Sequence, residues 1–101
     1  MEGIKYDEDK ARMDLIPSEA LFEIAKVMGF GAEKYGDHNW RNGMNWSRIY
    51  AAAQRHMAKW NSGDTYDEET KLNHLAHACV NMIFLLYYTE KGVGNDDRYK
   101  K

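Results

Sequence analysis

Apolar residues recur at helical spacing in three stretches of this chain, and polar, turn-forming residues separate the stretches. The first predicted helix begins after Pro17, a residue tolerated at a helix start, and ends or kinks at Gly31 or Gly36. Its apolar seam consists of Leu21, Ile24, Ala25 and Met28. Because the chain has one proline and few runs of β-branched residues, the pattern predicts an all-α protein, a small helical bundle.

A second helix is predicted after the loop 36–46, which is rich in turn-forming residues. Asn45 or Ser47 is expected to cap this helix, which runs to about Trp60. Its apolar seam consists of Ile49, Ala53, Met57 and Trp60. Arg48, Arg55 and Lys59 share another stripe of the same helix, which is either an ordinary solvated face or a clamp for an anionic ligand.

The run 72–86 predicts a third helix that is apolar on more than one face. Its main seam consists of Leu72, Leu75, Cys79, Met82 and Leu86. Val80, Phe84 and Leu85 lie outside this seam, and a helix that is apolar all round is buried all round. Two other helices leave part of this surface uncovered, so we expect a homo-oligomer, most simply a symmetric dimer, to complete the bundle.

The chain is expected to divide into an N-terminal arm (1–16), a helical domain (17–91) and a flexible C-terminal tail (92–101). Its 101 residues, 44% apolar and 30% charged, indicate one soluble globular domain. The net charge of −2 offers no general attraction to nucleic acid or membranes, and no apolar run reaches the ~20 residues of a membrane span. The lone Cys79 excludes an intrachain disulfide and, with no charged-then-apolar leader, favours a cytoplasmic protein.

Polar side chains interrupt the apolar surface of the third helix. His74, His77 and Asn81 fall within about 60° of one another around its axis. Polar groups in an apolar surface need partners, which a metal ion, a phosphate or a hydrogen-bond network would supply. His56 lies at the border of the apolar seam of the second helix, so we predict that the three histidines converge. The ordinary alternative is a set of core histidines with satisfied hydrogen bonds.

A metal site is one consequence of such convergence. Carboxylates are available near the predicted start of the third helix, where they also favour its dipole. They are Asp64, Asp67, Glu68 and Glu69. Imidazole with carboxylate suits Zn, Mn, Fe or Ni better than Mg, which prefers oxygen ligands.

Several blocks, in order along nearly the whole chain up to the tail, resemble the phage dATP/dGTP diphosphohydrolase family. The blocks are 10–17 (KARMDLIP), 31–36 (GAEKYG), 39–40 (NW), 54–56 (QRH), 67–70 (DEET) and 74–78 (HLAHA). That family is in turn similar to the MazG-like all-α nucleoside triphosphate pyrophosphatases. Bundles of the MazG type bind Mg²⁺ with a Glu-Glu-x-x-Glu helix and a Glu-x-x-Asp helix.

The resemblance implies hydrolysis of a purine deoxynucleoside triphosphate between its α and β phosphates, assisted by a divalent metal ion (Mg, Mn or Zn), in the host cytoplasm if a phage encodes the chain. The implied catalytic residues are His56, His77 and Glu69. The implied metal ligands are His56, His74, His77 and Glu69. The implied nucleotide-binding residues are Lys34, Tyr35, Asn39, Trp40, Arg48, Arg55, Lys59 and Asn81, with Trp46 as a further aromatic candidate for base stacking.

The sequence departs from the MazG pattern because segments 54–56 and 74–77 offer imidazoles and a guanidinium where that superfamily has carboxylates. Either a softer ion binds through the histidines and a carboxylate such as Glu69, or these residues bind phosphate directly without a metal. Two other interpretations stay open. One is a catalytically silent nucleotide-binding or interaction module, and the other is a structural phage protein whose buried histidines satisfy each other.

Overall fold

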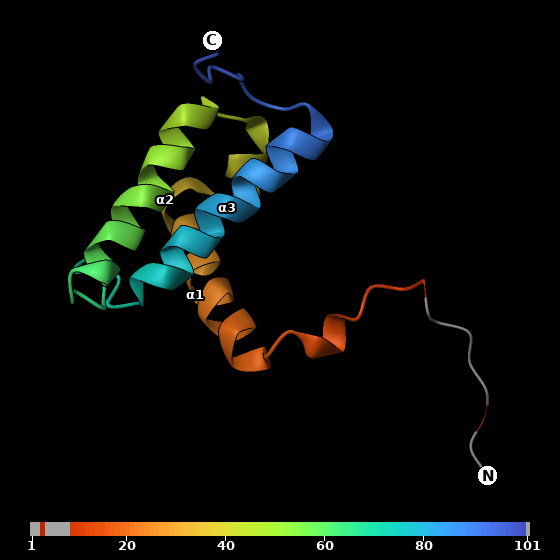
Figure 1. Ribbon diagram of the computed structural model, residues 1–101, viewed down its shortest axis with the longest axis vertical. Coiled ribbons are helices and arrows are strands. Elements are labelled where there is room, and N and C mark those ends of the chain that lie inside the picture. The colour runs from red at the N-terminus through yellow and green to blue at the C-terminus, as the bar shows by residue number, and fades with distance from the viewer. Residues whose placement is uncertain (1–2, 4–8, 101) are drawn as a thin grey trace.

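The computed structural model describes residue 3 and residues 9–100 of the chain, and this part is all-helical, as predicted. Its elements are the 3-10 turn η1 (Met13–Leu15), the helix α1 (Ser18–Tyr35), the 3-10 turn η2 (Asn39–Asn42), and the helices α2 (Trp46–Asn61) and α3 (His74–Lys91). Figure 1 shows α2 and α3 side by side, with α1 crossing behind them and the arm before α1 extending away. A small core joins α1 to α3 around Val27, Ala76 and Val80.

The local signals for helix ends are confirmed. Helix α1 begins directly after Pro17, and Gly36, at φ 95°, ends it because its left-handed backbone conformation suits a residue without a side chain. Gly31 lies inside α1 and does not end it. Helix α2 ends at Asn61, one residue beyond the predicted end.

The predicted apolar seam of the third helix is wrong. Leu75, Met82 and Leu86 are exposed, whereas the buried apolar residues of α3 are Ala76, Ala78, Val80 and Tyr88. Ala76 and Val80 pack against Val27 of α1, and α3 also contacts α2, so the packing of both helices decides which residues of α3 are covered. The larger side chains of the predicted seam therefore remain on the outside of the monomer.

The loop 62–73 carries the acidic residues to a different place from the one predicted. Helix α3 begins only at His74, and the side chain of Asn73 caps it by accepting a hydrogen bond from the Leu75 amide at 2.8 Å. Asp67, Glu68 and Glu69 therefore precede the helix in the sequence and are not part of its first turn. The His74 amide donates to Thr65 O at 2.9 Å, which ties the loop to the start of α3.

Residues 93–97 of the predicted C-terminal tail form hydrogen bonds with the start of α2. The indole of Trp46 donates to Val93 O at 2.9 Å, and the Trp46 amide donates to Asn95 O at 3.0 Å. Asp97 accepts a hydrogen bond from the Ser47 amide at 2.8 Å. Neither predicted residue caps α2 with its own side chain, since a carboxylate from the other end of the helical region does so.

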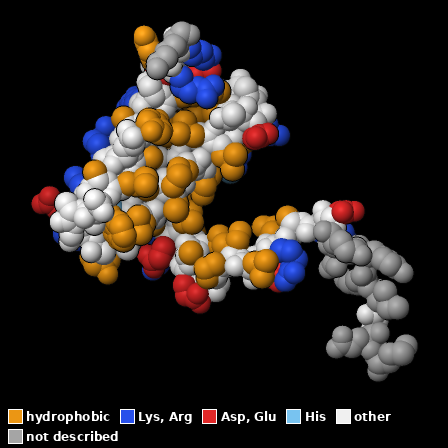
Figure 2. Space-filling model, viewed as in Figure 1, with side chains coloured by type: hydrophobic (Ala, Val, Ile, Leu, Met, Phe, Trp, Pro, Cys, Tyr) orange, Lys and Arg blue, Asp and Glu red, His pale blue; other side chains and the backbone are white. Residues whose placement is uncertain are grey.

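Apolar side chains remain uncovered along one side of the monomer. Figure 2 shows them spread over the visible face of the helical body and continuing onto the arm before α1. Met13, Leu15 and Phe22 are each about two-thirds exposed. The radius of gyration is 16.6 Å, larger than the roughly 13 Å of a compact 100-residue domain. Among the described residues, no helix combines the length and apolar character needed to cross a membrane.

Candidate functional site

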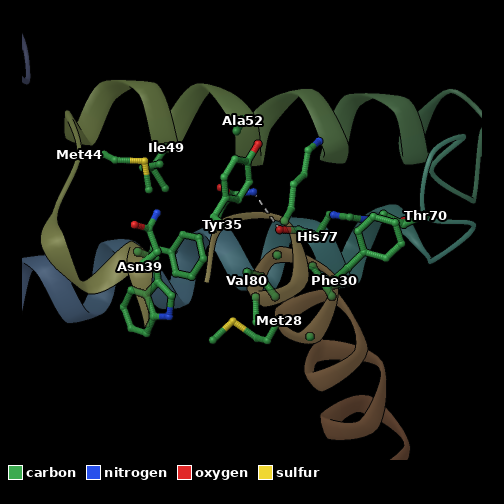
Figure 3. Close-up of a pocket in the computed structure, with 18 of the residues that line it drawn as sticks. Met28, Phe30, Tyr35, Asn39, Met44, Ile49, Ala52, Thr70, His77 and Val80 are labelled. Carbon is green, nitrogen blue, oxygen red and sulfur yellow. Dashed lines mark hydrogen bonds between the residues drawn. The ribbon is translucent and has the colours of Figure 1, made fainter. Parts of the chain in front are cut away.

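A cavity of about 820 Å³ opens between the end of α1, the loop that follows it, the middle of α2 and the first half of α3. Figure 3 shows residues of all these elements around it, among them Tyr35, Ala52, Thr70 and His77. The predicted site residues that line it are Lys34, Tyr35, Asn39, Trp40, Arg48, Arg55, Glu69, His77 and Asn81. Segments far apart in the sequence thus meet at one concave surface of a size suited to a small-molecule ligand.

Four predicted residues lie elsewhere. His56 and His74 lie outside the cavity lining, as does Lys59, although Lys59 shares a stripe of α2 with Arg48 and Arg55. Trp46 also lies outside, where its indole binds the C-terminal segment and the guanidinium of Arg98 covers its ring at 5.0 Å. Trp46 is therefore a packing residue and not an aromatic wall of the cavity.

Some cationic side chains of the cavity have no acidic partner among the described residues and are available to bind an anion. Arg48 and Arg55 form no ion pair within the described part of the chain. Lys34 Nζ lies 3.4 Å from Glu69 Oε2, and this contact with Glu69 raises the pKa of the lysine. Because both members of this pair are about half exposed or more, the ion pair adds little to stability. The two guanidinium groups remain suited to bidentate binding of a phosphate.

Phe30, Tyr35, Trp40 and Phe84 are the aromatic residues that line the cavity, and the two predicted ones, Tyr35 and Trp40, differ in exposure. Trp40 is packed, since its ring stacks on Phe84 with centroids 4.7 Å apart and the Arg41 guanidinium lies 4.6 Å from its centroid. Tyr35 is 63% exposed at the end of α1. The ring of Tyr35 is therefore more accessible to a ligand than that of Trp40.

The three histidines converge beside this cavity, as predicted, and we refer to His56, His74 and His77 as the histidine cluster. The Nδ1 atoms of His56 and His74 are 2.9 Å apart. The rings of His56 and His77 are stacked, with centroids 4.6 Å apart and 9° between their planes. Helix α2 supplies the first histidine and the first turn of α3 supplies the other two, so the packing of α2 on α3 creates the cluster.

Thr70 connects the histidine cluster to Asp67. The hydroxyl of Thr70 donates to Asp67 Oδ2 at 3.1 Å, and it lies 2.7 Å from His77 Nε2. A hydroxyl has one proton, so this oxygen accepts from the His77 Nε2–H. The other ring nitrogen, Nδ1, then carries the lone pair of a neutral imidazole.

Burial favours the neutral form of the His56 and His77 imidazoles. Loss of solvent, reinforced by the neighbouring His77 and His74, lowers the pKa of His56 to about 4. Burial also lowers the pKa of His77, against the opposing effect of Asp67. For Asp67, burial raises the pKa, but hydrogen bonds from Thr70 outweigh it and the net shift is downward. At neutral pH the site therefore combines the neutral imidazoles of His56 and His77 with the ionised carboxylate of Asp67.

Comparisons with known proteins identify the family of this chain. Residues 1–98 match the family model described as dATP/dGTP diphosphohydrolase, N-terminal. The chain belongs to this family. A protein of Salmonella phage PMBT28 named dATP/dGTP diphosphohydrolase is 36% identical over 98 residues, which is 97% of this chain and 33% of that relative. The chain thus spans about a third of the length of the relative it matches, and no solved structure matches it.

The donors present beside the cavity fit one class of metal ion. Ligand atoms of His56, Asp67 and His74 all lie within 4.8 Å of one another. Two imidazoles and one carboxylate suit Zn²⁺, Mn²⁺ or a similar transition metal, and they do not suit Mg²⁺. Of the predicted ligands, Glu69 instead pairs with Lys34 and His77 binds Thr70, so neither belongs to this group.

Sequence reasoning named Asp67 only as one of four acidic candidates and did not single out Thr70. The spacing Asp67-x-x-Thr70 is a usable signal, because an aspartate often accepts from the backbone amide three residues on, as it does here at 2.9 Å. No local signal distinguishes Asp67 from Glu69 as a partner of the histidines.

Proposed function

We propose that the chain binds a (deoxy)nucleoside triphosphate in the cavity and hydrolyses it to the monophosphate and pyrophosphate, with dATP or dGTP as the substrate in the cytoplasm of the host cell. The observation that carries the proposal is the meeting of Arg48, Arg55 and His77 in one cavity with the exposed ring of Tyr35. The name of the phage relative supports the choice of purine deoxynucleotides.

In this proposal the guanidinium groups of Arg48 and Arg55 bind the phosphate chain and Tyr35 stacks on the base. Lys34 contributes further positive charge, held near the cavity by Glu69. Asn81 donates its amide to His77 O at 2.9 Å, which fixes the direction of its carbonyl oxygen for a polar contact with the ligand. Asn39, on η2, supplies a second amide at the base end.

The reaction adds a water oxygen to the α phosphorus, breaks the bond from that phosphorus to the bridging oxygen, and releases pyrophosphate. His77 accepts the proton of the attacking water at Nδ1, since its Nε2–H is bound to Thr70. The arginines stabilise the negative charge that develops on the phosphate oxygens. A divalent ion bound near the histidine cluster would neutralise phosphate charge and lower the pKa of a bound water.

The test is a screen of the purified chain against all common nucleoside triphosphates, with pyrophosphate and monophosphate both measured. Arg55→Ala should reduce turnover by roughly 10–100-fold because a charge-assisted contact to the phosphates is lost. Lys59→Ala is the matched control, since this residue is a basic side chain of the same helix outside the cavity. Equal turnover in the Arg55 variant, or no product from any nucleotide, contradicts the enzyme proposal.

A catalytically silent nucleotide-binding module is the second candidate. It is favoured by the small number of carboxylates that line the cavity, where Glu69 pairs with Lys34 and Asp37 is the other acidic residue. A MazG-like bundle with Mg²⁺ chemistry needs more carboxylates than these. Saturable nucleotide binding in calorimetry, without product, would establish this alternative.

We further propose that the chain acts as a homo-oligomer. Phe22 on α1 and Leu86 on α3 are 68% and 63% exposed, and the described arm adds Leu15 to this uncovered apolar surface. A second copy of the chain would bury it. Light scattering at micromolar concentration should give at least a dimer, and Leu86→Glu should shift the population towards monomer. A monomeric wild-type chain contradicts this proposal.

A further inference from the structure

One nitrogen of the histidine cluster lacks a partner in the interior. His74 is 1% exposed, and its Nε2 has no hydrogen-bond partner within the described part of the chain. Buried polar side-chain atoms almost always have such a partner, and exceptions call for an explanation. The nearest carboxylate oxygen is Asp64 Oδ2 at 3.4 Å, in an orientation that does not make a hydrogen bond.

The other nitrogen of the same ring faces His56. The two Nδ1 atoms are 2.9 Å apart, and each of them has a lone pair when it is not protonated. As a hydrogen bond this contact uses one proton and one lone pair. Nitrogens at this separation can also both reach a single ion at the ~2.0–2.1 Å typical of metal–imidazole bonds.

A carboxylate completes the set from a third segment. Asp67 is partly buried in the loop 62–73, and its candidate ligand oxygen lies within 4.8 Å of the ligand atoms of both histidines. The hydrogen bonds from Thr70 use Oδ2 of this carboxylate, and no hydrogen bond within the described residues uses Oδ1. The three groups therefore converge from α2, the loop and the first residue of α3.

We propose that His56, Asp67 and His74 bind a divalent transition-metal ion through the two Nδ1 atoms and the aspartate. Asp64 then accepts a hydrogen bond from His74 Nε2–H, which fixes the tautomer in which Nδ1 faces the ion. This arrangement gives the orphaned nitrogen a partner after a small movement of an exposed side chain. Three protein ligands leave a position on the ion for water or another small ligand.

The site differs from the cavity and does not rest on the function proposed for it. None of its three ligands lines the cavity, whereas His77 does and stays outside the ligand set because Thr70 occupies its Nε2. The ion instead ties the loop 62–73 to both helices. Because that loop also carries Glu69 and Thr70 to the cavity wall, ion binding holds the wall in place.

The experiment uses the full chain treated with a chelator, desalted, and incubated with Zn²⁺, Co²⁺, Mn²⁺ or Mg²⁺ alone. Metal analysis after gel filtration should find about one Zn²⁺ or Co²⁺ per chain, with a higher melting temperature, and no effect of Mg²⁺. Bound Co²⁺ should show the visible absorption of nitrogen and oxygen coordination. Absence of uptake, or uptake of Mg²⁺ alone, overturns the proposal.

Variants assign the ligands. His56→Gln and Asp67→Asn preserve side-chain shape and should each remove most of the Zn²⁺ uptake, even if His74→Ala fails to fold. Asp64→Asn should weaken uptake by about 10–100-fold, as expected for a residue that holds a ligand in place. His38→Ala is the matched control, because this exposed histidine contacts Arg41 and lies outside the cluster. Full uptake by the first two variants overturns the assignment.

Discussion

The two ends of α2 differ in how completely their polar groups are satisfied. At its start, the indole of Trp46, the Ser47 amide and the Ser47 hydroxyl all have partners in the segment 93–97. Towards its other end, Arg55 has no ion pair within the described residues, and the neighbouring cluster contains the orphaned Nε2 of His74. At the start of α2, the C-terminal segment satisfies these polar groups. Towards the other end, polar groups without a partner in the described part of the chain remain available to bind a ligand.

The largest effect on stability is expected at the start of α2, from Gly94→Ala. A Cβ at this position would lie 2.5 Å from Met44 O and 3.1 Å from the Trp46 indole nitrogen, and the backbone has φ +81°. Backbone strain and overpacking together should cost roughly 2–5 kcal/mol of unfolding free energy, measured by urea denaturation.

The matched control for this variant is Gly31→Ala. That glycine lies within α1, and an added Cβ meets nothing within 4 Å. The substitution should stabilise the protein by roughly 0.5–1 kcal/mol. If Gly94→Ala is as stable as wild type, the docking of the C-terminal segment does not depend on this close approach.

At the other end, His77→Ala should act on chemistry instead of stability. Loss of the proposed proton acceptor should reduce nucleotide turnover by about 10²–10⁴-fold. The melting temperature should change less than turnover, because Thr70, the main hydrogen-bond partner of the imidazole, retains its bond to Asp67. Turnover and thermal melting are measured on the same preparation. A large fall in melting temperature with unchanged specific activity would make His77 a structural residue.

A smaller effect is expected from Thr70→Val, which keeps the side-chain shape and removes the hydroxyl between Asp67 and His77. The loss of these hydrogen bonds should cost about 1–3 kcal/mol of unfolding free energy. It should also lower turnover, since the His77 tautomer is no longer held. Thr70→Ser restores the hydroxyl and should recover turnover. If serine does not rescue activity, the hydroxyl does not orient the imidazole.

The smallest effect is expected from Asp97→Asn at the start of α2, where a modest fall in melting temperature should leave turnover unchanged. Hydrogen bonds from the Ser47 side chain and amide hold the pKa of Asp97 below its usual range. The carboxylate therefore stabilises the fold above the pKa of a free aspartate, about 3.9, and this contribution disappears as the pH falls through the lower folded pKa. The difference in melting temperature between variant and wild type should shrink over that interval, and a constant difference would contradict this role.

Much of the fold follows from local signals in the sequence. Helix α1 lies between Pro17 and Gly36, because the proline ring fixes a φ suited to a helix start and glycine adopts the positive φ that ends the helix. The buried face of α3 was not predictable from hydrophobicity. Ala76 and Ala78 are buried whereas Leu86 is exposed, because the placement of α1 and α2 against α3 decides which of its residues are covered.

In the candidate site, too, some features follow from the sequence and others depend on tertiary packing. The two histidines of α3 share a stripe because of helical periodicity, so their proximity follows from the sequence. Their contact with His56 depends on how α2 packs against α3. The acidic partner depends on the path of the loop 62–73, which places Asp67 beside the imidazoles and Glu69 beside Lys34.

The sequence by itself determined the family, the three helices and the residue types available for a site, because periodicity, helix ends and short motifs are properties of neighbouring residues. Only the tertiary structure decided that Arg55 faces the cavity while Lys59, one turn further along the same stripe, does not. It also decided that Asp97 caps α2. These outcomes depend on contacts between residues far apart in the chain, where many pairings are chemically reasonable and packing selects one of them.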